Sequence, residues 1–544
     1  MATILPEEIL SIICQELGRE RDFNTLFNCA LSARTLADPA LRTIYQYHEL
    51  SPAFNFTEDD IRSRDGTGED SQHYFLRWTS LWRSLIASSL EPSTTYKPYC
   101  RYSRILDFRN LTDMLESPRF RSAKRQFYAR PLTKLAHTKK EGKYETVDVV
   151  ATINDIGETV IPKATLLEEM SGHLRPGFLT RWISQTPRLK RMVLWRGDAL
   201  NNDAGKAVAD HCEHFNDLRV YEFLDPDADE VVAKFLDQLN ADTILYLRVI
   251  SHNNLGRLSF EALDRHTTLK ELMLNNLSRE AMENLNGLKG CTNLEVLSLE
   301  DGRGTVRLEE LHNDVFLEVI SWLSSCIKLK DITLKRFFDG PAILAAVAVA
   351  PEVRWSKLCL EGYTVRNASS ASFHTALADQ KHLEELYLSG NGEDTHSHDL
   401  EIMVSSICQL GNLRELNLRQ VSDEFDMTHI SNLVLNLPLL EEFWTSGQEL
   451  SSDILPLLAN LRSLKNLTLF ALTQFDTDSI LDFISRLDKD KQQGFQLSLM
   501  AVDQDFALSE EEQRLIVEAM KVQVDGRFDF VLWRELESED SEDD

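Results

Sequence analysis

Apolar residues recur along most of the chain in one short pattern, apolar-x-x-apolar-x-apolar. From Leu189 onward the pattern occurs twelve times, and successive copies begin 24 to 35 residues apart. The alternation at its end places every other side chain on one face, which predicts a short strand with a buried apolar face. Between these strands, segments such as 309–325, 399–409 and 476–487 have the apolar spacing of helices. Each unit is therefore predicted as one strand followed by one helix.

A repeat of this length, with one strand and one helix, is typical of leucine-rich repeats, which stack to bury a continuous core. The predicted fold class is α/β: a small three-helix module, then a curved leucine-rich repeat solenoid with parallel strands on its concave face and helices outside. The apolar positions of the successive strands are Leu189/Met192/Leu194, Leu218/Tyr221/Phe223, Ile244/Leu247/Val249, Leu269/Leu272/Leu274, Leu294/Leu297/Leu299, Leu329/Ile332/Leu334, Trp355/Leu358/Leu360, Leu383/Leu386/Leu388, Leu413/Leu416/Leu418, Leu440/Phe443/Thr445, Leu464/Leu467/Leu469 and Gly494/Leu497/Leu499.

Residues 1–48 are predicted as three short helices. Pro6 begins the first helix and Gly18 ends it, Asp22 caps the second, and Asp38 with the proline after it begins the third. Three helices in so few residues make a weak core, yet the segment has more large apolar side chains than one inner face can use. The surplus is expected to pack on a partner or on the rest of the chain.

The rest of the chain divides by composition. Residues 49–180 are predicted as a helical, basic linker region with a polar loop over 57–72 and an atypical first repeat. The leucine-rich repeat domain is predicted over 181–534, with about twelve repeats and a closing strand. The last residues, 535–544, are acidic or serine in large part and are expected to be disordered.

The formal net charge is −29, and it is unevenly distributed. Between Arg77 and Lys143 basic residues exceed acidic ones by ten, so the rest of the chain is even more acidic. An acidic body repels phosphate backbones, which disfavours nucleic acid as a partner and favours either solubility or a basic protein partner. Two interpretations of the basic segment stay open: it bridges the helical module to the first repeat, or it binds phosphate.

Several classes of protein are excluded by what the sequence lacks. The N-terminus has no basic region ahead of an apolar run, and no stretch is long and apolar enough to span a membrane. The eight cysteines include no C-x-x-C pair, which fits reduced thiols. We therefore expect a protein of the cytoplasm or nucleus with no membrane partner. No phosphate-binding loop, zinc-protease or nucleophile-elbow motif occurs, so we expect no enzyme activity, cofactor or metal.

The N-terminal segment resembles an F-box in the run Leu5-Pro6-x-Glu8-Ile9-x-x-Ile12 and the leucines that follow it. In the repeats, Cys291 and Cys326 each stand three residues before a strand leucine, which is similar to the cysteine-containing class of leucine-rich repeats. The pairing of the two parts resembles the F-box/leucine-rich repeat proteins, particularly the divergent fungal-type ones.

This resemblance implies a function in ubiquitin ligation. The module would dock on the Skp-type adaptor of an SCF cullin–RING ubiquitin ligase, and the repeats would bind a protein substrate. Carried over residue by residue, the adaptor-binding side chains are Leu5, Pro6, Ile9, Ile12, Ile13, Leu17 and Leu26.

The side chains that flank the buried leucines of each strand point to the concave face. These positions carry eight acids and five bases. Large aromatic side chains at solvent-facing positions are typical binding anchors, although loops or the C-terminal tail covering them is an equal alternative. Trp444 and Phe470, on adjacent repeats, are predicted to form one patch. The predicted substrate-binding residues are Trp195, Tyr246, Tyr387, Trp444 and Phe470.

Three functions fit these features. The first is the substrate receptor of a cullin–RING ligase. The second is a non-degradative leucine-rich repeat scaffold that binds the adaptor but does not direct degradation. The third is a repeat-only binding module whose N-terminal helices merely cap the solenoid, and it predicts no adaptor binding.

Overall fold

The structure is a computed structural model. It describes residues 5–50, 68–141, 144–363, 368–390, 397–422, 424–501 and 507–532. The contacts of the chain divide it into two compact units, unit 1 (Met1–Asn254) and unit 2 (Leu255–Asp544). The predicted limits at residues 48 and 180 do not coincide with this division, because the N-terminal helices pack onto the helices and strands that follow them. The predicted tail over 535–544 lies outside the described residues.

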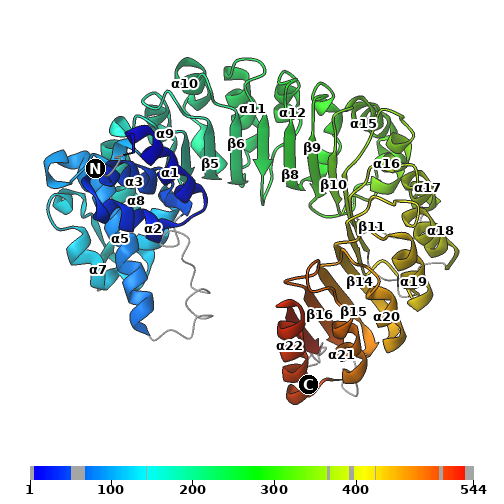
Figure 1. Cartoon of the computed structure of the whole chain (residues 1–544). Coiled ribbons are helices and arrows are strands. Elements are labelled where there is room, and N and C mark those ends of the chain that lie inside the picture. The colour runs from blue at the N-terminus through cyan, green and yellow to red at the C-terminus, as the bar shows by residue number, and fades with distance from the viewer. Residues whose placement is uncertain are drawn as a thin grey trace, which may run out of the picture. The chain divides into compact units, whose positions relative to one another are not determined.

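Unit 1 combines the N-terminal helices with the first part of the repeat sheet (Figure 1). Its helices are α1 (Glu7–Arg19), α2 (Phe23–Ser32), α3 (Arg34–Gln46), α5 (Gly68–Leu90), α6 (Phe108–Glu116), α7 (Phe120–Phe127), α8 (Val149–Val160), α9 (Pro176–Ile183), α10 (Ala204–His211) and α11 (Ala228–Gln238). Its parallel strands, in spatial order, are β1 (Ile105–Asp107), β4 (Glu169–Gly172), β5 (Arg191–Arg196), β6 (Asp217–Glu222) and β7 (Tyr246–Val249). A separate antiparallel hairpin joins β2 (Thr138–Glu141) to β3 (Tyr144–Val147).

Unit 2 is a regular stack in which every described strand pairs in parallel with the next one along the chain. Its strands are β8 (Glu271–Leu277), β9 (Val296–Asp301), β10 (Asp331–Lys335), β11 (Lys357–Tyr363), β12 (Glu385–Gly390), β13 (Glu415–Arg419), β14 (Glu442–Ser451), β15 (Asn466–Gln474), β16 (Gln496–Ala501) and β17 (Arg527–Leu532). Its helices are α12 (Arg257–Leu263), α13 (Arg279–Met282), α14 (Leu308–Leu311), α15 (Asn313–Ser325), α16 (Gly340–Ala348), α17 (Ala368–Leu377), α18 (Ser397–Ile407), α19 (Met427–Asn436), α20 (Leu455–Leu458), α21 (Thr477–Ser485) and α22 (Glu510–Val524).

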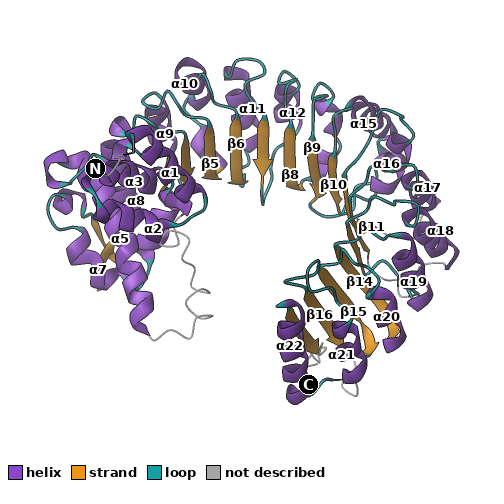
Figure 2. Ribbon diagram, viewed as in Figure 1, coloured by secondary structure: helices purple, strands orange, loops and turns teal. Residues whose placement is uncertain are grey.

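The repeated apolar pattern makes the core of both units. One predicted copy is shifted: on β6 the three apolar positions are held by Phe215, Leu218 and Val220, and not by Leu218, Tyr221 and Phe223. Strand leucines such as Leu297 and Leu386 are fully buried between the strand layer and the helix layer, which Figure 2 shows as separate layers in unit 2. The thiols of Cys291 and Cys326 donate to the carbonyl oxygens of Leu263 and Cys291, one repeat earlier, at 3.5 and 3.6 Å. The α/β fold of stacked leucine-rich repeats is therefore confirmed, and the cysteines help to join successive repeats.

The sheet begins before the first regular motif of the sequence. Strands β1 and β4 pair in register, Leu106 beside Met170, where we expected a single atypical repeat. Both side chains are fully buried, as strand leucines are in later repeats. The spacing from Leu167 to Met170 repeats the first half of the pattern, but Gly172 stands at its last apolar position. With one apolar position missing, the pattern does not distinguish this strand from a loop.

Three local predictions in the N-terminal region need correction. The first helix continues through Gly18, whose place is fixed by packing: a Cβ there would lie 2.6 Å from Cγ2 of Thr43 on α3. The third helix starts at Arg34, so Pro39 lies inside it. Proline has no backbone N–H, so the carbonyl oxygen of Thr35, four residues earlier, lacks its helical hydrogen bond, and Thr35 is exposed. Residues 68–72 of the predicted loop belong to α5, while its earlier part lies outside the described residues. The predicted cap of the second helix is confirmed, because the Asp22 carboxylate accepts from the Thr25 amide.

Among the described residues, we find no helix with both the length and the apolar composition needed to cross a bilayer.

Candidate protein-binding surfaces

The three N-terminal helices share a small core of their own. Cys14, Leu26 and Ala40, one from each helix, are fully buried against one another. The third helix also attaches the module to the rest of unit 1. The hydroxyl groups of Tyr45 and Ser84 are hydrogen-bonded at 2.6 Å, and the Tyr45 ring stacks on Tyr99 at 4.2 Å between centroids. One side of the module is thus fixed to α5 and the segment after it, which leaves α1 and α2 to face outward.

The outward side of the module is an apolar surface, which we call the helical face. Its side chains are between 42% and 71% exposed. Leu5 precedes α1, the others of the first group follow on α1 at helical spacing, and on α2 they lie one turn apart. The helical face consists of Leu5, Ile9, Ile12, Ile13, Phe27 and Leu31.

Two of the predicted adaptor-binding residues do not lie on this face. Leu26 is fully buried in the module core, and Leu17 packs against the same core from the edge. Both side chains hold the module together, so we remove them from the candidate contact set. Leu5, Ile9, Ile12 and Ile13 stay in it, and Pro6 is exposed at the start of α1 beside them.

Two residues of the helical face were absent from the predicted set. Phe27 and Leu31 are among the most exposed large apolar side chains of the module. The helical spacing indicated their direction. If Leu26 points into the module, the residues one and five positions later lie on a different side of α2 and point away from the module core. Their exposure extends the apolar surface from one helix to two.

The second candidate surface is the strand face of unit 2, whose side chains point away from the helices. It consists of the residues that alternate with the buried leucines on β8 to β16. Register places Glu385, Glu415 and Glu442 side by side on three consecutive strands. Neighbouring strands lie about 4.8 Å apart, so these carboxylates repel one another.

The strand face balances only part of this charge. Lys357 Nζ lies 2.7 Å from a Glu385 oxygen, the Tyr387 hydroxyl donates to Glu415, and the Asn466 amide donates to Glu442 at 2.5 Å. The lysine therefore pairs with one of the three carboxylates, and in the described part of the chain the other two accept hydrogen bonds from neutral groups. Burial and the carboxylates around it raise the pKa of the Tyr387 hydroxyl. The face is left with an excess of negative charge.

An aromatic patch adjoins the acidic row. The rings of Trp444 and Phe470 stack with centroids 5.9 Å apart and planes 27° from parallel. The Arg419 guanidinium lies 5.9 Å from the centroid of Trp444. The structure thus brings these two predicted anchors together, with Tyr387 in the same middle row of the face. Their role in substrate binding stays a prediction.

The two predicted anchors of unit 1 are placed differently. The Trp195 ring is stacked on Tyr221 at 4.0 Å and has the Arg109 guanidinium 4.6 Å from its centroid. Tyr246 lies on β7 and is half-buried. Trp195 therefore already contacts neighbouring side chains of the chain itself, and part of its ring is not available to a partner.

The basic segment of unit 1 contacts the helical module. Lys97 Nζ lies 2.5 Å from an Asp38 oxygen of α3, and Arg42 of α3 lies over the Tyr102 ring. The Arg83 guanidinium donates to the carbonyl oxygens of Gln126 and Arg130. These contacts support the bridging interpretation for part of the segment. Within the described part of the chain, no three His, Cys, Asp or Glu side chains are placed to hold a metal ion.

Comparison with known proteins gives neighbours in structure only. No family model matches the chain, and no curated protein matches its sequence. Similar solved structures include the complex of Rad7 and Elc1 in yeast, with 13% identity, 66% of this chain and 85% of that chain covered, and a TM-score of 0.37.

Two other solved structures are similar at the same level. The leucine-rich repeat ectodomain of the plant receptor kinase GASSHO1/SCHENGEN3 from Arabidopsis thaliana has 12% identity and a TM-score of 0.25, with 69% of this chain and 54% of that chain covered. TLR13 in its complex with ssRNA13 has 13% identity and a TM-score of 0.28, with 69% and 63% covered. Likenesses at this level assign no function to the chain.

Proposed function

We propose that the chain is a substrate-recognition adaptor of an SCF-type E3 ubiquitin ligase. In this proposal the helical face docks on a Skp-type adaptor, and the strand face of unit 2 holds a protein substrate. The chain would work in the cytoplasm or nucleus. It would supply position and effective concentration, with no catalytic group, cofactor or metal of its own.

The helical face is the observation that carries this proposal. Six large apolar side chains are exposed on two short helices, although α1 and α2 already bury a core of their own. Burying a side chain of this size contributes roughly 1.5–3 kcal/mol, so leaving six in water is costly unless a partner covers them. A helical cap of a solenoid needs no such outward surface, because capping repeats are polar on their outer side.

The test is a pull-down of a Skp-type adaptor by the full chain, with the double variant Ile9→Asp/Ile12→Asp beside it. Two carboxylates on the helical face would be buried without partners in the complex, so adaptor binding should be abolished. Both side chains are exposed in the free protein, so the variant should fold. Leu317→Asp on α15 is the matched control, since Leu317 is equally exposed but belongs to unit 2.

Two results would oppose the proposal. If the wild-type chain does not bind the adaptor, the repeat-only module is the better description. If it binds, but substrates found on the strand face do not accumulate when the protein is removed from cells, the chain is a non-degradative scaffold.

A further inference from the structure

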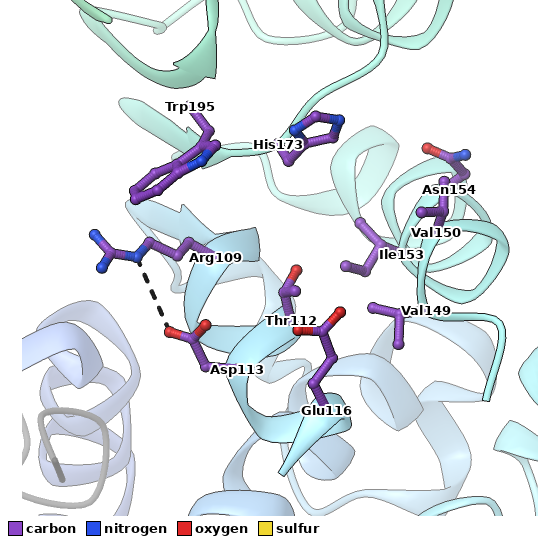
Figure 3. Close-up of a pocket in the computed structure, with 10 residues that line it drawn as sticks. All are labelled: Arg109, Thr112, Asp113, Glu116, Val149, Val150, Ile153, Asn154, His173 and Trp195. Atoms are coloured by element: carbon purple, nitrogen blue, oxygen red, sulfur yellow. Dashed lines mark ion pairs between the residues drawn. The ribbon is translucent and has the colours of Figure 1, made fainter. Parts of the chain in front are cut away.

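A pocket in unit 1 lies outside both surfaces described above. Its volume is about 490 Å³, within the range of ligand pockets in proteins. Arg109 follows β1, His173 follows β4, and Trp195 lies near the end of β5, so the carboxyl ends of three neighbouring strands border it. Helices α6 and α8 form its other walls (Figure 3).

The inner wall of the pocket is apolar. Val149, Val150 and Ile153 of α8 face Thr112 and Glu116 of α6 across the pocket (Figure 3). Val150 is 39% exposed, so its side chain is accessible to an occupant of the pocket. This wall suits an aliphatic or aromatic side chain from outside.

The charged groups of the pocket are not equivalent. The Arg109 guanidinium lies over Trp195 and has its Nε 4.0 Å from an Asp113 oxygen. Glu116 has no ion-pair partner among the described residues, and its carboxylate lies beside Thr112, on the side of α6 that faces α8 (Figure 3). Burial raises the pKa of Asp113, which Arg109 opposes. The charge that the pocket leaves unbalanced is therefore negative.

An amide side chain adds a third point of contact. Asn154 lines the pocket and is nine-tenths buried, yet its side chain has no hydrogen-bond partner in the described part of the chain. The Asn154 amide thus offers a donor and an acceptor to an occupant of the pocket. The N–H and C=O of one residue in an extended peptide point to the same side and satisfy both at once.

We infer that this pocket binds an extended peptide segment in which an aliphatic or aromatic residue stands next to a lysine or arginine. The apolar side chain packs on Val150 and Ile153, the cation pairs with Glu116, and the peptide backbone bonds to Asn154. Because Trp195 belongs to the strand face of unit 1, the segment continues onto that face. The inference rests on the proposed function in one respect: the segment belongs to the substrate.

The test is selection of phage-displayed random 12-residue peptides on the full chain, followed by binding measurements with the selected peptides in fluorescence polarisation. We expect peptides with an apolar residue adjacent to Lys or Arg. Val150→Asp and Glu116→Lys should each weaken their binding about tenfold or more. Both side chains are exposed enough for the variants to fold. Val349→Asp and Glu213→Lys, at exposed positions away from the pocket, are the matched controls and should change nothing.

Exchanging the charges of Glu116 and of the basic peptide residue distinguishes a direct ion pair from a general effect of the substitution on the pocket. A selected peptide with its basic residue changed to glutamate should bind Glu116→Lys better than it binds the wild-type chain. If no such peptide is enriched, if both pocket variants bind as the controls do, or if the exchange restores nothing, the inference is overturned. Peptide binding needs no Skp-type adaptor, so the two tests are independent. If the chain binds the adaptor but no peptide, only this inference is opposed. If it binds the peptide but no adaptor, only the proposed function is opposed.

Discussion

The helical face and the strand face of unit 2 differ in almost every physical property. The helical face is apolar across two helices. The strand face is polar in large part, with a row of three glutamates and a single aromatic pair. An apolar surface of six residues suits one partner that always covers it, whereas fixed charges discriminate among partners and are easily changed. The comparison indicates that the two faces bind different partners.

The largest effect is expected on the helical face. Phe27→Ala/Leu31→Ala should weaken adaptor binding at least about 100-fold, because two large side chains lose their buried contacts. Leu435→Ala on α19 is the control, since Leu435 is exposed to a similar degree. Isothermal titration with the adaptor gives the affinities. Equal affinity in variant and control would restrict the docking surface to α1.

The aromatic patch of the strand face should give a smaller, selective effect. Trp444→Ala/Phe470→Ala removes the stacked pair, and proteins that co-purify with the repeats should decrease about 10- to 30-fold. Quantitative mass spectrometry of the co-purified proteins measures this decrease. Adaptor recovery should stay at the wild-type level, as should every partner in Leu515→Ala/Val517→Ala on the outside of α22. Partners that persist unchanged would move substrate binding to another surface.

A substitution between α1 and α3 should disturb the helical face without altering any of its side chains. In Gly18→Val the new side chain overlaps Thr43 and Tyr47, with contacts of 2.6 and 2.9 Å already at Cβ, so α1 must shift from α3. We expect a loss of roughly 1–3 kcal/mol in the stability of the module. Hydrogen exchange should accelerate in residues 7–46 and stay constant in unit 2. Gly411→Val is the control, because nothing lies within 4 Å of a Cβ there. Equal exchange in both variants contradicts the packing role.

The smallest effect at neutral pH concerns a histidine in the helix layer behind the strand face. Burial lowers the pKa of His374 on α17 to about 4, from about 6.5 when unfolded. A depressed pKa means that the stability linked to the neutral ring is complete above pH 6.5 and is lost as the pH falls toward 4. At pH 5 the loss is roughly 2 kcal/mol.

His374→Leu should therefore reduce the fall in the unfolding midpoint between pH 7 and pH 5. His429→Leu is a control, because the His429 side chain is 16% exposed and already faces Asp426 at 2.7 Å. Urea unfolding at the two pH values measures the difference. An unchanged pH dependence in His374→Leu would show that the ring is not buried in its neutral form.

The sequence by itself determined the repeat architecture. Buried leucines recur with a period that fits one strand and one helix, and each such unit can bury its apolar side only against the next one. The prediction failed where this periodicity weakens. At β4 the last apolar position of the pattern is held by Gly172. Pro39 was predicted to begin the third helix, but that helix begins five residues earlier, at Arg34.

Only the tertiary structure decided which side chains are available to partners. The helical spacing shows that α1 and α2 each have an apolar side, but it does not show which apolar residues pack into the small core. Leu26 and Phe27 are adjacent in sequence, yet Leu26 is buried and Phe27 is exposed. Trp195 was the one residue of the pocket between α6 and α8 that the sequence singled out, because the others come from separate segments that only the folded chain brings together. The spacing of apolar residues is a local property of the chain, whereas the exposure of each side chain depends on contacts between residues far apart in sequence.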